Sequence, residues 1–143
     1  MHEHAAPTSP LPEAARRWLL PAIVLSAVAS GLHVLVMPAH FEEWFGYGLF
    51  FLLAAAAQGI YAALLLYRGA ERRLLWVGIL GNALVIGLYL VTRTVGIPFF
   101  GPEAGEVEGI GLVDVASKVV EMALITCLAN LLRAAPAGRP SRA

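Results

Sequence analysis

The stretch that decides the fold runs from Trp18 to Met37 and reads WLLPAIVLSAVASGLHVLVM. It contains no Asp, Glu, Lys or Arg. A helix needs about 20 mainly apolar residues to cross a hydrocarbon core roughly 30 Å thick, and this stretch has that length. Three further stretches are similarly long and mainly apolar, namely Trp44–Tyr67, Leu74–Ile97 and Ile110–Leu132. The sequence therefore predicts four transmembrane helices.

The composition supports the same conclusion. Of the 143 residues, 59% are hydrophobic and 14% charged, against about 45–50% and about 25% in ordinary globular proteins. We expect an all-α membrane protein with one domain, a four-helix transmembrane bundle at residues 18–133, between tails at residues 1–17 and 134–143. The net charge is zero, so no electrostatic argument favours nucleic acid, and the expected surroundings are a lipid bilayer.

Positive charge gathers in three of the segments outside the predicted helices. The first tail, the second connection and the segment from Arg133 onward hold eight of the ten basic residues: Arg16, Arg17, Arg68, Arg72, Arg73, Arg133, Arg139 and Arg142. The first and third connections, Pro38–Glu43 and Pro98–Gly109, hold only acidic charge. Because arginine-rich segments stay on the cytoplasmic side, we expect a multi-pass protein of the cell (inner) membrane with both termini in the cytoplasm.

Polar residues inside the predicted helices fall on one face of each helix. Residues three, four, seven or eleven apart share a helix face. The faces defined in this way are Ser26, His33 and His40 on the first helix, Asn82, Tyr89 and Arg93 on the third, and Asp114, Lys118 and Glu121 on the fourth. The second helix contributes only Gln58.

These polar faces predict a ligand site inside the membrane. Ionisable groups at membrane depth are costly and usually point into the bundle. We expect an outward-facing polar cavity, with Glu121 as its floor, that binds a cation, a proton or a small polar ligand. The residues expected to bind this ligand are His33, Asn82, Tyr89, Arg93, Asp114, Lys118 and Glu121.

Two interpretations of the charges on the fourth helix are open. Asp114 precedes Lys118 by four residues and Glu121 follows it by three, spacings that permit ion pairs within one helix. In the first interpretation these pairs only fix helix packing, and the chain is an accessory or scaffold subunit of a larger complex or a homo-oligomer. In the second, Glu121 binds a cation or a proton opposite His33 or Arg93.

His33, His40 and Glu43 are the candidate metal ligands, because zinc and copper accept imidazole and carboxylate groups. The two imidazoles are about 10 Å apart by helix rise, so they reach one ion only if the helix breaks near Pro38. A divalent metal stays open as a cofactor. Haem held by two histidines is disfavoured, because only His33 lies within the bundle.

Catalysis has little support in the sequence. It contains no GxSxG, HExxH, P-loop or dinucleotide-binding motif. Cys127 is the only cysteine, which excludes an intramolecular disulfide. We therefore nominate no catalytic residue and do not favour an enzyme.

Two segments on the acidic side carry a resemblance to known proteins. They are His33-x6-His40-Phe41-Glu42-Glu43-Trp44, and Thr94-Val95-Gly96-Ile97-Pro98 with Gly101-Pro102-Glu103 after it. The pattern resembles small bacterial membrane proteins with four transmembrane helices. The resemblance implies the same membrane fold and no activity, so it adds no functional residue.

The charge distribution makes a testable prediction about topology. The loop Glu103–Glu108 should face the outside of the cell, because turning the chain over would translocate all the arginine-rich segments. A cysteine placed in this loop should react with a membrane-impermeant maleimide added to intact cells. Labelling that occurs only after lysis would refute the orientation.

Overall fold

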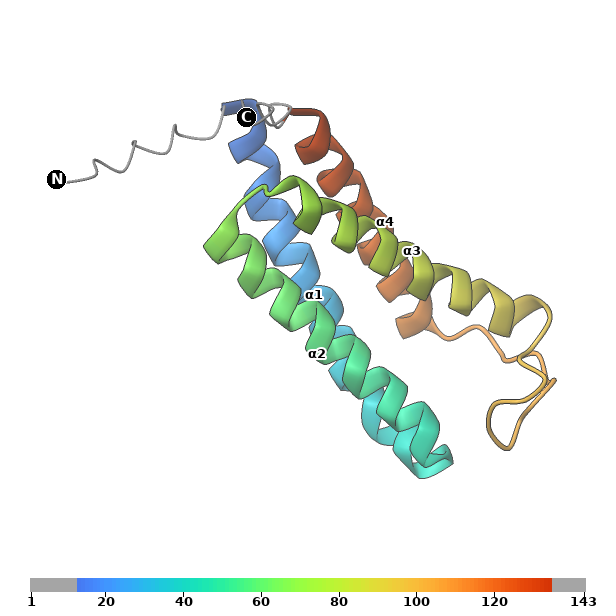
Figure 1. Ribbon diagram of the computed structural model, residues 1–143. Helices are drawn as coiled ribbons and strands as arrows, with labels where there is room; N and C mark the ends of the chain where they lie inside the picture. The colour runs from blue at the N-terminus through green and yellow to red at the C-terminus, as the bar shows by residue number, and fades with distance from the viewer. Residues whose placement is uncertain (1–12, 135–143) are drawn as a thin grey trace, which may run out of the picture.

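The computed structural model describes residues 13–134, and its regular structure there is entirely α-helical (Figure 1). Helix α1 spans Glu13–Glu43, α2 spans Phe45–Arg68, α3 spans Arg72–Thr94 and α4 spans Leu112–Ala134. Residues 1–12 and 135–143 of the two predicted tails lie outside the described residues. The number and order of the helices agree with the sequence analysis.

Three of these helices, α1, α2 and α3, are long and apolar enough to cross a membrane. Helix α4 is not among them, and its first half carries Asp114, Lys118 and Glu121. Large apolar side chains such as Leu20, Leu53 and Leu84 are exposed on the helices, and extensive apolar surface of this kind is typical of contact with a membrane. The structure is therefore consistent with a multi-pass membrane protein.

The predicted end of the first helix at Met37 is wrong. Helix α1 continues through Pro38 to Glu43, and Trp44 alone, with an extended backbone, separates it from α2. A proline inside a helix costs one backbone hydrogen bond and about 3 kcal/mol or more, so the last turns need other support. They find it against α2, where the His40 ring lies 4.0 Å from the Phe51 ring. Pro21, near the start of the predicted span, also lies inside α1.

The third connection is longer than predicted, because α3 ends at Thr94 and α4 begins at Leu112. Gly96 ends the helix with a φ of +74°, a backbone conformation that side chains with a Cβ rarely adopt. A Cβ there would lie 2.6 Å from the Glu106 carbonyl oxygen. Glycine at this position therefore lets the connection, residues 95–111, fold back on itself.

The helices pack as two antiparallel pairs. Helix α1 contacts α2 and, to a lesser extent, α4, while α3 contacts α4, and α2 meets α3 only narrowly. Figure 1 shows the pairs close together where α1 begins and α4 ends, and apart toward the α1–α2 turn and the 95–111 connection. The buried apolar core, which includes Leu65, Leu75, Leu128 and Leu131, lies at the end where the pairs are close together, here called the closed end. The described arginines other than Arg93 belong to the start of α1, to the end of α2 and start of α3, and to the end of α4, the same segments that form this core.

Helices α2 and α3 meet closely beside Gly78. The Tyr61 hydroxyl donates a hydrogen bond of 3.0 Å to the Leu74 carbonyl across this contact. A Cβ at Gly78 would lie 2.1 Å from the Tyr61 hydroxyl oxygen and 2.8 Å from a methyl carbon of Leu128. Only glycine therefore leaves room for the buried Tyr61 ring.

This contact makes a prediction about stability. Gly78→Ala should lower the free energy of unfolding by about 1–3 kcal/mol, because the added methyl group overpacks the core. Gly81→Ala is the matched control, since a Cβ there meets nothing within 4 Å, and it should be neutral or slightly stabilising. Both can be measured by denaturation in detergent micelles. Equal effects of the two substitutions would contradict the proposed role of Gly78.

Candidate functional site

A cavity of about 670 Å³ lies between the two helix pairs, at the end opposite the core. All four helices and the 95–111 connection contribute to its lining. The lining is mainly aliphatic and aromatic, which differs from the polar cavity that the sequence suggests. Cavities of about 300–1,000 Å³ with apolar walls and a few polar groups are typical small-molecule sites.

The deepest polar group beside the cavity is Glu121, which is 0% exposed. Its Oε1 lies 3.1 Å from His33 Nε2 on α1, where a protonated ring nitrogen donates to the carboxylate. Its Oε2 accepts a hydrogen bond of 2.6 Å from Lys118 Nζ, one turn earlier on α4. A buried carboxylate needs such partners, because an unpaired charge is strongly disfavoured away from water. The deep cluster, His33, Lys118 and Glu121, therefore joins α1 to α4.

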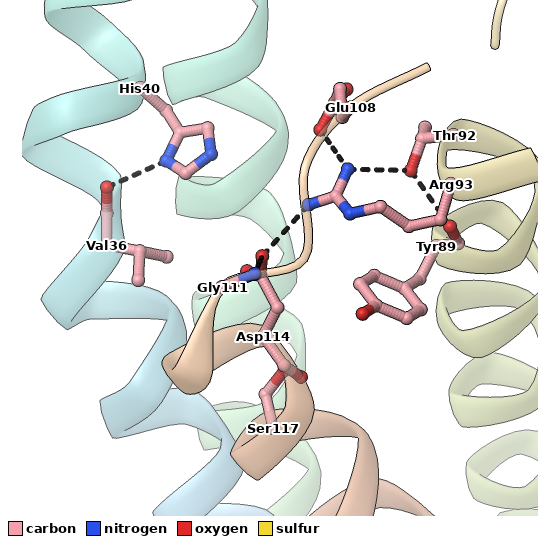
Figure 2. A network of polar contacts seen from close by, with 9 residues as sticks. All are labelled: Val36, His40, Tyr89, Thr92, Arg93, Glu108, Gly111, Asp114 and Ser117. Carbon is pink, nitrogen blue, oxygen red and sulfur yellow. Dashed lines mark hydrogen bonds and ion pairs between the residues drawn. The ribbon is translucent and has the colours of Figure 1, made fainter.

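A second cluster, the rim cluster, surrounds Arg93 at the end of α3 (Figure 2). Arg93 Nη2 donates to Asp114 Oδ2 at 2.9 Å, and Nη1 donates to Glu108 in the 95–111 connection. One guanidinium group thus holds two carboxylates, and the arrangement uses the fork of donors that distinguishes arginine from lysine. The Arg93 side chain is only 11% exposed, so these partners are its main polar environment.

Asp114 is placed by the start of its own helix. Its Oδ2 also accepts the backbone N–H of Gly111 at 3.2 Å, just before the first residue of α4. An acidic side chain in the first turn that binds back to the N-terminal backbone stabilises the helix end. The helix start therefore fixes the carboxylate where Arg93 reaches it.

Tyr89 connects the two clusters. The Arg93 guanidinium lies 4.9 Å from the centre of its ring, and Lys118 Nζ lies 5.6 Å from the same centre. Figure 2 shows the ring beneath the guanidinium, with His40 on α1 on the opposite side. Both basic groups of the site therefore lie on the wall made by α3 and α4.

The 95–111 connection closes one side of the cavity. The Tyr47 hydroxyl on α2 donates to the Phe100 carbonyl at 3.2 Å, and the Trp44 and Phe100 rings meet edge to face at 5.0 Å. Phe99, Phe100 and Glu108 contribute to the cavity lining. The connection therefore forms a wall of the site, as the glycine and proline pattern of this segment allows.

The predicted metal ligands His33, His40 and Glu43 all line the cavity but form no cluster. His33 Nε2 binds Glu121, and His40 Nδ1 donates to the Val36 carbonyl at 2.9 Å. Within residues 13–134, no three His, Cys, Asp or Glu side chains lie together as a metal site requires. The physical reason is that α1 continues past Pro38, which keeps the two histidines two turns apart.

The other predicted site residues are divided between the cavity and the helix packing. His33, Tyr89, Arg93, Asp114 and Lys118 line the cavity, whereas Glu121 lies directly behind its wall. Asn82 is buried away from it and accepts a hydrogen bond of 3.3 Å from Gln58 Nε2. Asn82 thus contributes to the α2–α3 contact and does not line the site.

Sequence reasoning missed one carboxylate and one set of rings. Glu108 is not among the predicted site residues, yet it binds Arg93. Its signal is weak, because a loop has no periodicity from which to predict a partner. Phe50 and Phe51 of α2 are not among the predicted site residues, yet both line the cavity. The Tyr47, Phe50 and Phe51 spacing of three and four residues was the available signal.

The deep cluster makes a prediction about stability. Glu121→Leu leaves the Lys118 ammonium group without its carboxylate and should destabilise the protein by about 3–5 kcal/mol. The double variant Lys118→Met with Glu121→Leu should lose far less than the two single variants together, because replacing both members of a buried pair is often nearly neutral. Unfolding free energies of all three variants in detergent test this. Additive losses would show that the pair has no energetic coupling.

Three comparisons with known proteins give no guide to this site. No protein-family model, no curated protein and no solved structure matches the chain. The geometry of the two clusters and the cavity therefore carries the functional argument.

Proposed function

We propose that this protein is a membrane-embedded cation-binding protein, and that the cavity between its helix pairs is the binding site. The observation that carries the proposal is the charge balance around that cavity. The deep and rim clusters together contain three carboxylates, Glu108, Asp114 and Glu121, and two basic groups, Arg93 and Lys118. One negative charge is therefore in excess while His33 is neutral.

The surroundings make this excess charge important. Glu43, an exposed carboxylate at the cavity mouth, adds a second negative charge. An uncompensated charge is costly in an apolar environment, and a bound cation or a proton on His33 compensates it. A neutral polar ligand leaves the excess charge as it is. The geometry therefore favours a cation within the range of ligands that the sequence suggests.

The proposed orientation has four transmembrane helices, both termini in the cytoplasm and a location in the cell (inner) membrane. Six arginines at the closed end support it: Arg16, Arg17, Arg68, Arg72, Arg73 and Arg133. The positive-inside rule assigns that end to the cytoplasm. The cavity then faces the outer side, from which it receives its ligand.

The main alternative is an accessory or scaffold subunit without a ligand of its own. The pairing of each cluster carboxylate with at least one basic group favours this alternative. On this interpretation the clusters only hold α1, α3, α4 and the 95–111 connection in register. The two proposals differ in what cations do to the purified protein.

A matched pair of charge variants tests the proposal. Glu108→Gln removes the excess charge and leaves Arg93 paired with Asp114, so the fold should survive. Glu103→Gln removes one exposed carboxylate from the same connection, outside the cavity lining. Sodium, potassium and tetramethylammonium chloride are titrated, and the melting temperature reports binding, because a ligand of the folded state stabilises it.

At least one of these cations should raise the melting temperature of the wild type and of Glu103→Gln at the same concentrations. Glu108→Gln should need roughly tenfold more or respond not at all, since a unit charge a few ångströms away contributes a kcal/mol or more at an effective dielectric constant near 20. Identical responses of the two variants, or no response from the wild type to any cation, would favour the scaffold alternative.

A further inference from the structure

The wall of the cavity opposite Arg93 and Lys118 is aromatic. Six aromatic side chains contribute to the lining as a whole: Tyr47, Phe50, Phe51, Tyr89, Phe99 and Phe100. The Tyr89 ring already contacts the basic groups of Arg93 and Lys118. The remaining five belong to α2 and to the 95–111 connection, and within residues 13–134 none of them forms a cation–π contact with a basic group of the site.

This aromatic wall has no basic side chain of its own. The described residues of α1 and α2 that line the cavity include His33, His40 and Glu43, but no Lys or Arg. The face of an aromatic ring attracts a cation by roughly 0.5–2 kcal/mol, most strongly where water is excluded. The α1–α2 wall therefore combines aromatic rings with one carboxylate, Glu43, while the repulsive charges of Arg93 and Lys118 lie on the opposite wall.

The size of the cavity selects among cations. A volume of about 670 Å³ is that of a small-molecule site and far exceeds what an inorganic ion fills. Aliphatic side chains such as Val85 and Leu88 add apolar surface beside the rings. An inorganic ion gains nothing from this surface, whereas an apolar ligand body is favoured by about 25 cal/mol for each Å² it buries.

We propose that the ligand is an organic cation, an amine or quaternary ammonium compound with an apolar or aromatic body. This inference rests on the proposed function and specifies its ligand class. The cationic group lies toward the α1–α2 wall, near Glu43 at the cavity mouth and away from the Arg93 guanidinium. The apolar body packs against Phe51, whose ring lies 5.6 Å from that of His33 and 4.0 Å from that of His40.

Three probe ions of related structure test this ligand class. Benzyltrimethylammonium carries both charge and aromatic body, tetramethylammonium carries the charge alone, and benzenesulfonate carries the ring with the opposite charge. Binding is followed by the fluorescence of Trp44, beside Phe100, in a protein with Trp18→Phe and Trp76→Phe. Benzyltrimethylammonium should bind at least roughly tenfold more tightly than tetramethylammonium, given the apolar area of a benzyl group, and benzenesulfonate should not bind.

Two variants assign the effect to the aromatic wall. Phe51→Leu preserves apolar volume and removes the ring face, and it should weaken benzyltrimethylammonium binding roughly fivefold to tenfold. Phe45→Leu is the matched control, since Phe45 is 68% exposed and outside the lining, and it should bind like the parent protein. A thermal melt of each variant checks that the fold is retained.

The outcomes separate the ligand class from the proposed function. Equal affinities for the two ammonium ions, or equal effects of Phe51→Leu and Phe45→Leu, overturn the organic-cation proposal. If sodium or potassium binds in those cases, the proposed cation-binding function stands without it. If no cation binds at all, the proposed function itself fails, and the ligand class fails with it.

Discussion

The hydrogen bonds of Glu121 are the constraint on which the rest of the structure depends. This carboxylate has no exposed surface, and it reaches His33 on α1 and Lys118 on α4. In an apolar interior each of these contacts offsets part of the cost of removing the carboxylate from water. Helices α1 and α4 therefore cannot separate or slide past each other at this level without losing that compensation. On one side of Glu121 leucines fill the space between the helices, and on the other side the helix pairs part. The carboxylate therefore marks the boundary between the core and the cavity.

The two clusters differ in what they are suited to do. The deep cluster is compact, because His33 and Lys118 both contact Glu121 directly. The rim cluster includes Glu108 from the 95–111 connection, whose side chain is 34% exposed. This partly exposed carboxylate shares its arginine with Asp114, so Arg93 keeps one carboxylate partner if Glu108 turns to a ligand. Under the proposed function, structural and binding roles fall on different carboxylates, although the sequence predicts a binding role for Glu121.

The number and order of the four helices could be predicted from the sequence, because length and hydrophobicity dominate in such helices. The three polar stripes also converge, since His33 meets Glu121, and Arg93 meets Asp114. Periodicity could not predict that α1 continues past Pro38, because the contact between His40 and Phe51 that supports its last turns is a tertiary one. It also could not separate Asn82 from Tyr89, which share a helix face but lie at different depths. Tyr89 lines the cavity between the separated helix pairs, whereas Asn82 lies at the contact between α2 and α3. Which of the two residues reaches the cavity therefore depends on where α2 and α3 meet.

The charged groups are spread along the direction of the helices, and this has an electrical consequence. Asp114 and Glu121 are seven residues apart on α4, about 10 Å by helix rise. In the proposed orientation a cation that moves inward from the rim crosses part of the transmembrane field. The full potential contributes about 2.3 kcal/mol for each elementary charge and 100 mV, so a fraction of this acts on the bound ion. In the proposed orientation, cation occupancy of the cavity would therefore increase as the cell interior becomes more negative, and binding would register as a displacement current.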